Sequence, residues 1–117
     1  MADILYAEDE FTNRRLIQIH LERAKISCDL ASDGEEAWEM FNKESYRLII
    51  LDQYMPGMNG DELARKIKAV DPDIPLIAIT SDDTEAGSLK KAGFSEVFIK
   101  PLRGRDYIDT IVKYLKP

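Results

Sequence analysis

Four short runs of apolar residues recur along the chain, at residues 4–7, 48–51, 76–79 and 97–99. In a strand with one solvent-exposed face, polar and apolar residues alternate. These four runs show no such alternation. Continuous apolar runs of this length are typical of strands buried on both faces of a parallel sheet. A fifth run, residues 26–31, is more polar, which favours a strand at the edge of that sheet.

Helical patterns fill the segments between these runs. Apolar residues recur there at intervals of three and four positions, most clearly over residues 107–115 and most weakly over residues 86–93. Strand and helix therefore alternate five times, which predicts right-handed crossovers and helices on both faces of one sheet. A closed barrel needs roughly 200 residues or more. The pattern thus predicts an α/β fold with an open, doubly wound, five-stranded parallel sheet and five helices.

The chain has 117 residues, which suits a single domain over residues 1–117. Its net charge of −6 argues against nucleic acid as a direct partner, because phosphate binding needs clustered Lys and Arg. No apolar run approaches the roughly 20 residues of a membrane span, and the first residues do not resemble a signal peptide. The single cysteine, Cys28, excludes an internal disulfide. We therefore expect a cytoplasmic protein without a membrane partner.

Polar side chains follow four of the predicted strands at the point where each one ends. Glu8 and Asp9 follow the first, Asp52 the third, Thr80 the fourth and Lys100 the fifth. Ligands of open parallel sheets bind at the carboxyl ends of the strands, near the point where the strand order reverses. We expect these five side chains to meet at one edge of the sheet.

Three carboxylates placed close together repel one another unless a cation neutralises them. Oxygen ligands suit Mg²⁺, which keeps several waters in a shallow site, so the acids predict a magnesium site. Lys100 adds a second positive charge, and Thr80 adds a hydroxyl. A carboxylate beside a cation, a hydroxyl and an ammonium group can attack phosphorus and hold the resulting phosphoryl oxygens.

Four motifs, each after its own predicted strand, resemble those of the response-regulator receiver domains of two-component signalling. They are Glu8-Asp9-Glu10, the run LDQYMPGMNG over residues 51–60, Thr80-Ser81, and Lys100-Pro101-Leu102. The resemblance covers residues 4–115 and implies a flavodoxin-like sheet with strand order 2-1-3-4-5. It also implies a signalling switch rather than a conventional enzyme, with a histidine kinase or histidine phosphotransfer protein as donor and a downstream effector protein as recipient.

The resemblance assigns Asp52 as the nucleophile that takes a phosphoryl group from phosphohistidine. It assigns Mg²⁺ to Asp52, to Asp9 directly, to Glu8 through a water molecule, and to the backbone carbonyl of Tyr54.

Two further residues have a role implied by the same resemblance. Thr80 would hydrogen-bond the phosphoryl group once it is present. Lys100 would pair with a phosphoryl oxygen, or with Asp52 before phosphorylation, and the Lys100–Pro101 peptide would be cis.

The sequence departs from the family pattern at three places. Glu8 stands where the first acid is commonly Asp, and Val97 stands where an aromatic often serves as part of the switch, with Phe98 expected on the opposite face of the strand. The positions that tune the lifetime of the phosphoryl group are Tyr54 and Asp82, and an acid at Asp82 could either orient a hydrolytic water or repel it.

Three other functions compete with the phosphoryl switch. A receiver-like interaction module that is not phosphorylated remains the alternative, although such a module usually loses one of the site residues. An aspartyl-phosphate phosphohydrolase of the haloacid-dehalogenase type needs a second Asp where this chain has Tyr54. A flavin-binding protein needs a phosphate-cradling loop after the first strand, and Glu8, Asp9 and Glu10 would repel that phosphate.

Overall fold

Five parallel strands form one sheet in the order β2-β1-β3-β4-β5 in the computed structural model, which describes residues 2–102 and 105–116. The predicted α/β fold and strand order are therefore confirmed. The predicted domain also includes four residues that lie outside the described ones: Met1, Arg103, Gly104 and Pro117. The strands are β1 (Ile4–Ala7), β2 (Cys28–Ala31), β3 (Leu48–Asp52), β4 (Leu76–Thr80) and β5 (Glu96–Ile99).

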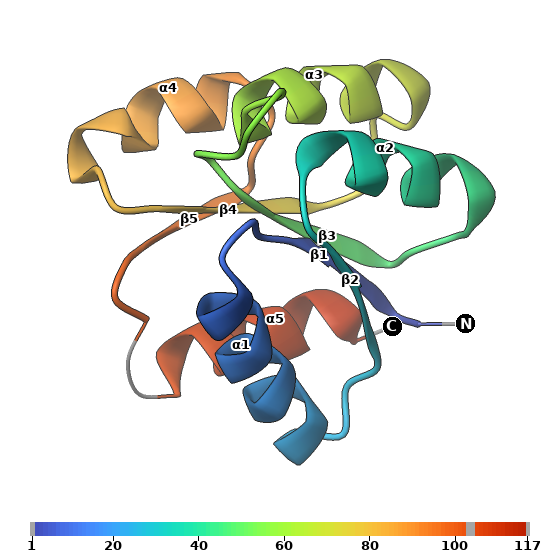
Figure 1. Ribbon diagram of the computed structural model, residues 1–117, viewed down its shortest axis with the longest axis vertical. Coiled ribbons are helices and arrows are strands. Elements are labelled where there is room, and N and C mark those ends of the chain that lie inside the picture. The colour runs from blue at the N-terminus through green and yellow to red at the C-terminus, as the bar shows by residue number, and fades with distance from the viewer. Residues whose placement is uncertain (1, 103–104, 117) are drawn as a thin grey trace.

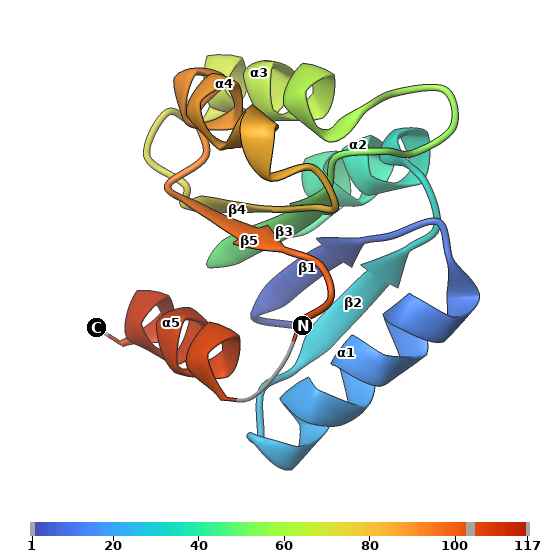
Figure 2. The ribbon, with the colours of Figure 1, turned by 90° about the vertical axis from the view of Figure 1, so that its left-hand side faces the viewer.

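Helices cover both faces of the sheet (Figure 1). On one face lie α2 (Gly34–Lys43), α3 (Gly60–Val70) and α4 (Ala86–Lys91), and on the other lie α1 (Phe11–Arg23) and α5 (Asp106–Leu115). Figure 2 shows the same two layers from the side. The weak fourth helical pattern corresponds to a six-residue helix that buries only Leu89 and follows a short 3₁₀ turn, η1 (Asp83–Glu85).

Alternate residues of the central strands fill two separate cores. Leu5 and Ile49 pack in the core beneath α2 and α3, whereas Tyr6 and Ile50 pack in the core against α1 and α5. Because neighbouring residues of a strand point to opposite faces, both sides of β1 and β3 must be apolar. This is why these strands have no polar alternation in the sequence.

The edge strand is shorter than the sequence predicted. It begins at Cys28 instead of residue 26, because Ile26 closes the end of α1: its N–H donates to the carbonyl of Leu21, 2.9 Å away. Lys25, between helix and strand, has a φ of 61° and donates to Glu22. This is the pair of hydrogen bonds of a Schellman cap, and it removes Ile26 from the strand.

None of the helices within residues 2–102 and 105–116 combines the length and the apolar character needed to cross a membrane.

Candidate functional site

The register of the strands brings the predicted acids together. Ala7 of β1 pairs with Leu51 of β3, so that the next residues along, Glu8 and Asp52, lie beside each other at the carboxyl edge of the sheet. Both are buried, at 0% and 3% exposure. Apolar strands on either side position these carboxylates, and their burial strengthens every charge interaction that they make.

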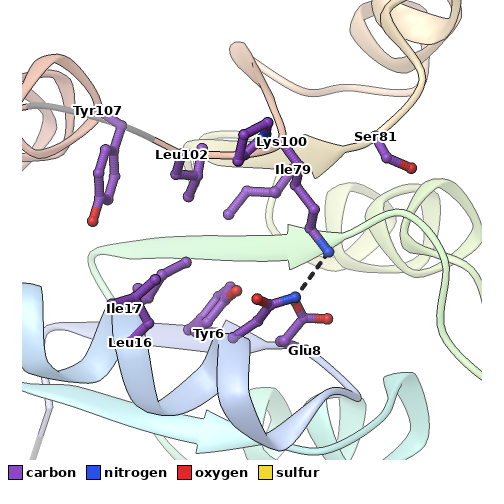
Figure 3. Close-up of a pocket in the computed structure, with 11 residues that line it drawn as sticks. Tyr6, Glu8, Leu16, Ile17, Ile79, Ser81, Lys100, Leu102 and Tyr107 are labelled. Carbon is purple, nitrogen blue, oxygen red and sulfur yellow. Dashed lines mark hydrogen bonds and ion pairs between the residues drawn. The ribbon is translucent and has the colours of Figure 1, made fainter.

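Lys100 bridges these two carboxylates. Its ammonium nitrogen lies 3.0 Å from Glu8 Oε1 and 3.1 Å from Asp52 Oδ2. Figure 3 shows the Lys100 side chain extending from the segment after β5 toward Glu8. The family resemblance implied a pair between Lys100 and Asp52, but not the equally short contact with Glu8. The Lys100–Pro101 peptide is cis, as expected.

Charge is not balanced within this group. Burial raises the pKa of Glu8, the neighbouring Asp52 raises it further, and Lys100 opposes both effects. Burial alone would lower the pKa of Lys100, but the two carboxylates outweigh it and raise that pKa above its ordinary value. One ammonium therefore faces two buried acids, and Asp9 adds a third carboxylate at the same edge.

The residues present fit a divalent cation. One carboxylate oxygen from each of Glu8, Asp9 and Asp52 lies within 4.8 Å of the other two, and oxygen donors alone suit Mg²⁺. Glu8 Oε2 is buried and has no hydrogen-bond partner among the residues that the structure describes, so it can accept from a metal-bound water. The Tyr54 side chain is 47% exposed, and the ligand role of its carbonyl stays a prediction.

Thr80 ends β4 as a fully buried side chain. Its hydroxyl oxygen accepts a hydrogen bond of 3.2 Å from the backbone N–H of Asp82. The Asp82 carboxylate in turn accepts from the backbone N–H and the hydroxyl of Thr84, at 3.0 and 2.6 Å, and these bonds lower the pKa of Asp82. Asp82 therefore caps the η1 turn, a structural role that the sequence analysis did not predict.

A family model described as the response regulator receiver domain matches residues 4–112. The chain belongs to this family. It is 35% identical over 107 residues to the transcriptional regulatory protein ResD of Bacillus subtilis, a match that covers 90% of the chain and 44% of ResD. It is 31% identical to the transcriptional regulatory protein SrrA of Staphylococcus aureus, again over 44% of the relative. The receiver domain thus spans less than half the length of these relatives.

Solved structures give the same result. The response regulator TrrA of Thermotoga maritima, in complex with Mg²⁺ and BeF, has a TM-score of 0.91 and 30% identity, over 98% of this chain and all of TrrA. The receiver domain of NtrX from Brucella abortus has a TM-score of 0.90 and 26% identity, over 97% of this chain and 98% of that one.

The loop after Asp52 of the receiver is fixed by Gln53, a residue that the sequence analysis did not single out. Its side chain is 6% exposed, and its Oε1 accepts from the N–H of Asp61 at the start of α3. Its backbone N–H donates to Ile79 of β4, and its carbonyl accepts from Gly60. Its place next to Asp52, at the end of a buried apolar run, is the signal that could have identified it.

Gly60 is a second residue whose importance the sequence did not reveal, since Asn59-Gly60 reads only as a turn. A Cβ at Gly60 would lie 2.6 Å from the carbonyl oxygen of Asp52 and 3.1 Å from the Cα of Gln53. Only glycine lets α3 approach the backbone of the residue that carries the buried carboxylate.

We expect Gly60→Ala to lower the free energy of unfolding by roughly 1–3 kcal/mol, because the new methyl group must displace the backbone around Asp52. Urea unfolding followed by Trp38 fluorescence measures the change. Gly87→Ala in α4 is the matched control, because a Cβ there meets nothing within 4 Å. That variant should gain about 0.5–1 kcal/mol from the higher helix propensity of alanine. Equal stabilities for the two variants would contradict the close approach at Gly60.

Two buried tyrosines of the receiver should respond oppositely to loss of the hydroxyl. The Tyr6 hydroxyl is buried and finds no hydrogen-bond partner in the described part of the chain, whereas the Tyr46 hydroxyl donates to Asp29 Oδ2 at 2.7 Å. We expect Tyr6→Phe to raise the free energy of unfolding by about 1 kcal/mol and Tyr46→Phe to lower it by a similar amount. Paired urea titrations of the two variants measure both signs, and a loss of stability in Tyr6→Phe would refute the first.

Proposed function

We propose that this receiver domain is a phosphoryl-accepting signalling switch, with Asp52 as the residue that is phosphorylated. The observation that carries the proposal is the placement of Asp52: a buried carboxylate held 3.1 Å from Lys100, with Glu8 and Asp9 oxygens within 4.8 Å. The Asp52 carboxylate is thus a nucleophile held in one orientation, beside groups that can bind a cation and a phosphoryl oxygen.

The transfer requires little covalent chemistry from the protein. An oxygen of the Asp52 carboxylate attacks the phosphorus of a phosphohistidine, forming a P–O bond as the P–N bond breaks. The electron pair of that bond goes to the imidazole nitrogen, and a proton from solvent leaves the ring neutral. The product on the receiver is an acyl phosphate at Asp52.

The other residues hold the group that arrives. Before phosphorylation, Lys100 pairs with the Asp52 carboxylate. After the transfer, its ammonium group pairs with a negatively charged phosphoryl oxygen. The Thr80 oxygen accepts from Asp82, so that its own proton is free to be donated to another phosphoryl oxygen.

Mg²⁺ would be held by Asp9, Asp52 and the Tyr54 carbonyl, with Glu8 acting through a water molecule. When bound, it supplies positive charge that offsets the repulsion between the acids and the incoming phosphoryl oxygens.

The donor in this proposal is a histidine kinase or a histidine phosphotransfer protein, and the recipient of the signal is an effector protein in the cytoplasm. Membership of the receiver family supports both partners. The relatives ResD and SrrA are named as transcriptional regulators, and they are more than twice as long as the matched region.

Incubation with acetyl phosphate, with and without Mg²⁺, tests the proposal. We expect intact-mass measurement to show the gain of one phosphoryl group only when Mg²⁺ is present, and peptide mapping to place it at Asp52. A label on His20, Thr80 or Ser81 would overturn the assignment. Absence of any mass gain, together with no amide shifts on addition of beryllofluoride, would favour the interaction module that is not phosphorylated.

A further inference from the structure

The first turn of α3 takes two of its hydrogen-bond partners from the residue that follows Asp52. The N–H groups at the start of a helix have no partner within the helix, and a side chain at the N-cap position usually accepts from one of them. Asn59 occupies that position, and its side chain makes no such bond. Gln53 replaces it: the Gln53 carbonyl accepts from the N–H of Gly60 and its Oε1 from that of Asp61, both at 2.9 Å.

Gln53 is itself held on both sides. Its side chain is 6% exposed, and its backbone N–H donates to the carbonyl of Ile79 in β4, 2.9 Å away. Its backbone N–H, backbone carbonyl and side-chain oxygen therefore all have partners, one in β4 and two in α3. Gln53 cannot move without breaking a hydrogen bond to one of these two elements.

The Tyr54 carbonyl lies between two fixed residues. Gln53 precedes it, and Met55, which follows, is buried in the core beneath α2 and α3. Further along the same loop, Met58 approaches the start of α2 so closely that a Cβ on Gly34 would lie 2.8 Å from the Met58 carbonyl oxygen. The loop is thus anchored on both α2 and α3, which Figure 1 shows on the same face of the sheet. These neighbours fix the Tyr54 backbone, whereas its own side chain is 47% exposed.

We propose that Gln53 is a positioning residue for Mg²⁺. The bonds from Gln53 to α3 fix the Tyr54 carbonyl, which completes the set of protein ligands begun by Asp9 and Asp52. This inference rests on the proposed function, in which that carbonyl is a ligand. Mg²⁺ requires nearly octahedral geometry with short bonds to oxygen, so displacement of one ligand weakens binding. Loss of a residue that orients a ligand typically costs roughly 10- to 100-fold in metal affinity.

The same bonds make the first turn of α3 sensitive to the metal. Coupling between two equilibria is reciprocal: where an ordered loop favours Mg²⁺, Mg²⁺ favours the ordered loop by the same factor. The acceptors for the Gly60 and Asp61 amides are both on Gln53. We therefore expect Mg²⁺ to slow hydrogen exchange at these two amides more than at the far end of α3.

Titration of Mg²⁺ with no phosphodonor present, followed by backbone amide shifts, tests the inference. Gln53→Met keeps the length of a buried side chain and replaces the amide with a thioether, which accepts hydrogen bonds only weakly. We expect its Mg²⁺ dissociation constant to rise roughly tenfold. Exchange at Asp61 should become faster, and Mg²⁺ should protect it less. Gln53→Asn keeps the amide on a shorter side chain and should weaken Mg²⁺ binding in the same direction.

Two further variants separate positioning from general effects. Asn59→Ala is the matched control, because it removes an amide from the N-cap position that makes no cap bond, and it should leave the Mg²⁺ constant unchanged. Gln53→Glu keeps an acceptor oxygen and adds negative charge, so it should not weaken Mg²⁺ binding. Urea unfolding in chelator measures the stability of each variant separately.

Two results would overturn this inference alone. In the first, Gln53→Met is less stable but binds Mg²⁺ with an unchanged constant, which would make Gln53 a purely structural residue. In the second, Asn59→Ala weakens Mg²⁺ binding as much as Gln53→Met does. Absence of Mg²⁺ binding by the unmodified protein would overturn the proposed metal site together with this inference. All of these constants are measured without a phosphodonor, so failure of phosphoryl transfer to Asp52 is a separate result.

Discussion

Asp52→Asn will not gain a phosphoryl group from acetyl phosphate under conditions that phosphorylate the unmodified protein. The rate of incorporation should fall by roughly a thousandfold or more, because an amide oxygen is a far weaker nucleophile than a carboxylate and a poorer ligand for a cation. Intact-mass measurement over time gives the rate. Asp83→Asn is the matched control, since it makes the same chemical change at an exposed carboxylate in η1 and should leave the rate unaltered.

The stability of Asp52→Asn separates loss of chemistry from loss of fold. In the presence of a chelator, the substitution removes one of the three acids but leaves Lys100 paired with Glu8. We therefore expect the free energy of unfolding to change by less than about 1 kcal/mol. A large destabilisation would mean that Asp52 is a structural residue, and continued incorporation of phosphoryl in Asp52→Asn would place the reaction elsewhere.

The fold follows closely from the sequence because its signals are local. Apolar runs specify β1, β3 and β4, which are buried on both faces, and Val97 and Phe98 fall in opposite cores, as strand alternation requires. The predicted start of β2 at residue 26 was wrong, because the cap of α1 takes up the backbone N–H of Ile26. The cap forms because Lys25 adopts a positive φ. Nothing in the sequence predicts that conformation for a lysine, since non-glycine residues seldom adopt it.

The candidate site was only partly predictable, for a different reason. Residues at strand ends indicate which side chains share an edge, but not which of them touch. The contact between Lys100 and Glu8 joins residues 92 positions apart, and it depends on how far the Lys100 side chain reaches from the segment after β5. The same holds for Gln53 and Gly60, which serve the site by anchoring the backbone of its central loop and carry no chemistry that a motif search would select.

Lys100→Met is expected to be more destabilising than Asp52→Asn. It keeps an apolar side chain of similar length and removes the only ammonium that pairs with Glu8 and Asp52 among the described residues. Two buried carboxylates are then left facing each other. Removing one partner of a fully buried pair costs about 3–5 kcal/mol, and because Lys100 is 25% exposed we expect roughly 1–3 kcal/mol at neutral pH.

The dependence of this loss on pH identifies its cause. Burial and Asp52 already raise the pKa of Glu8, and Lys100 is what opposes them, so Lys100→Met should raise that pKa further. A folded-state pKa above the unfolded value means that the folded protein holds the proton more tightly. Stability is therefore favoured at low pH and lost as pH rises through the folded pKa. The difference between the unmodified protein and Lys100→Met should widen from about pH 5 to about pH 8.

Urea unfolding in chelator, followed by Trp38 fluorescence at both pH values, measures this difference. Lys91→Met is the matched control, because Lys91 is exposed on α4 and its loss should change the free energy of unfolding by less than about 0.5 kcal/mol at either pH. A loss in Lys100→Met that stays constant with pH would show that it arises from altered packing. Lys100 would then stabilise this edge of the sheet through its hydrocarbon chain rather than through the charge that it shares between Glu8 and Asp52.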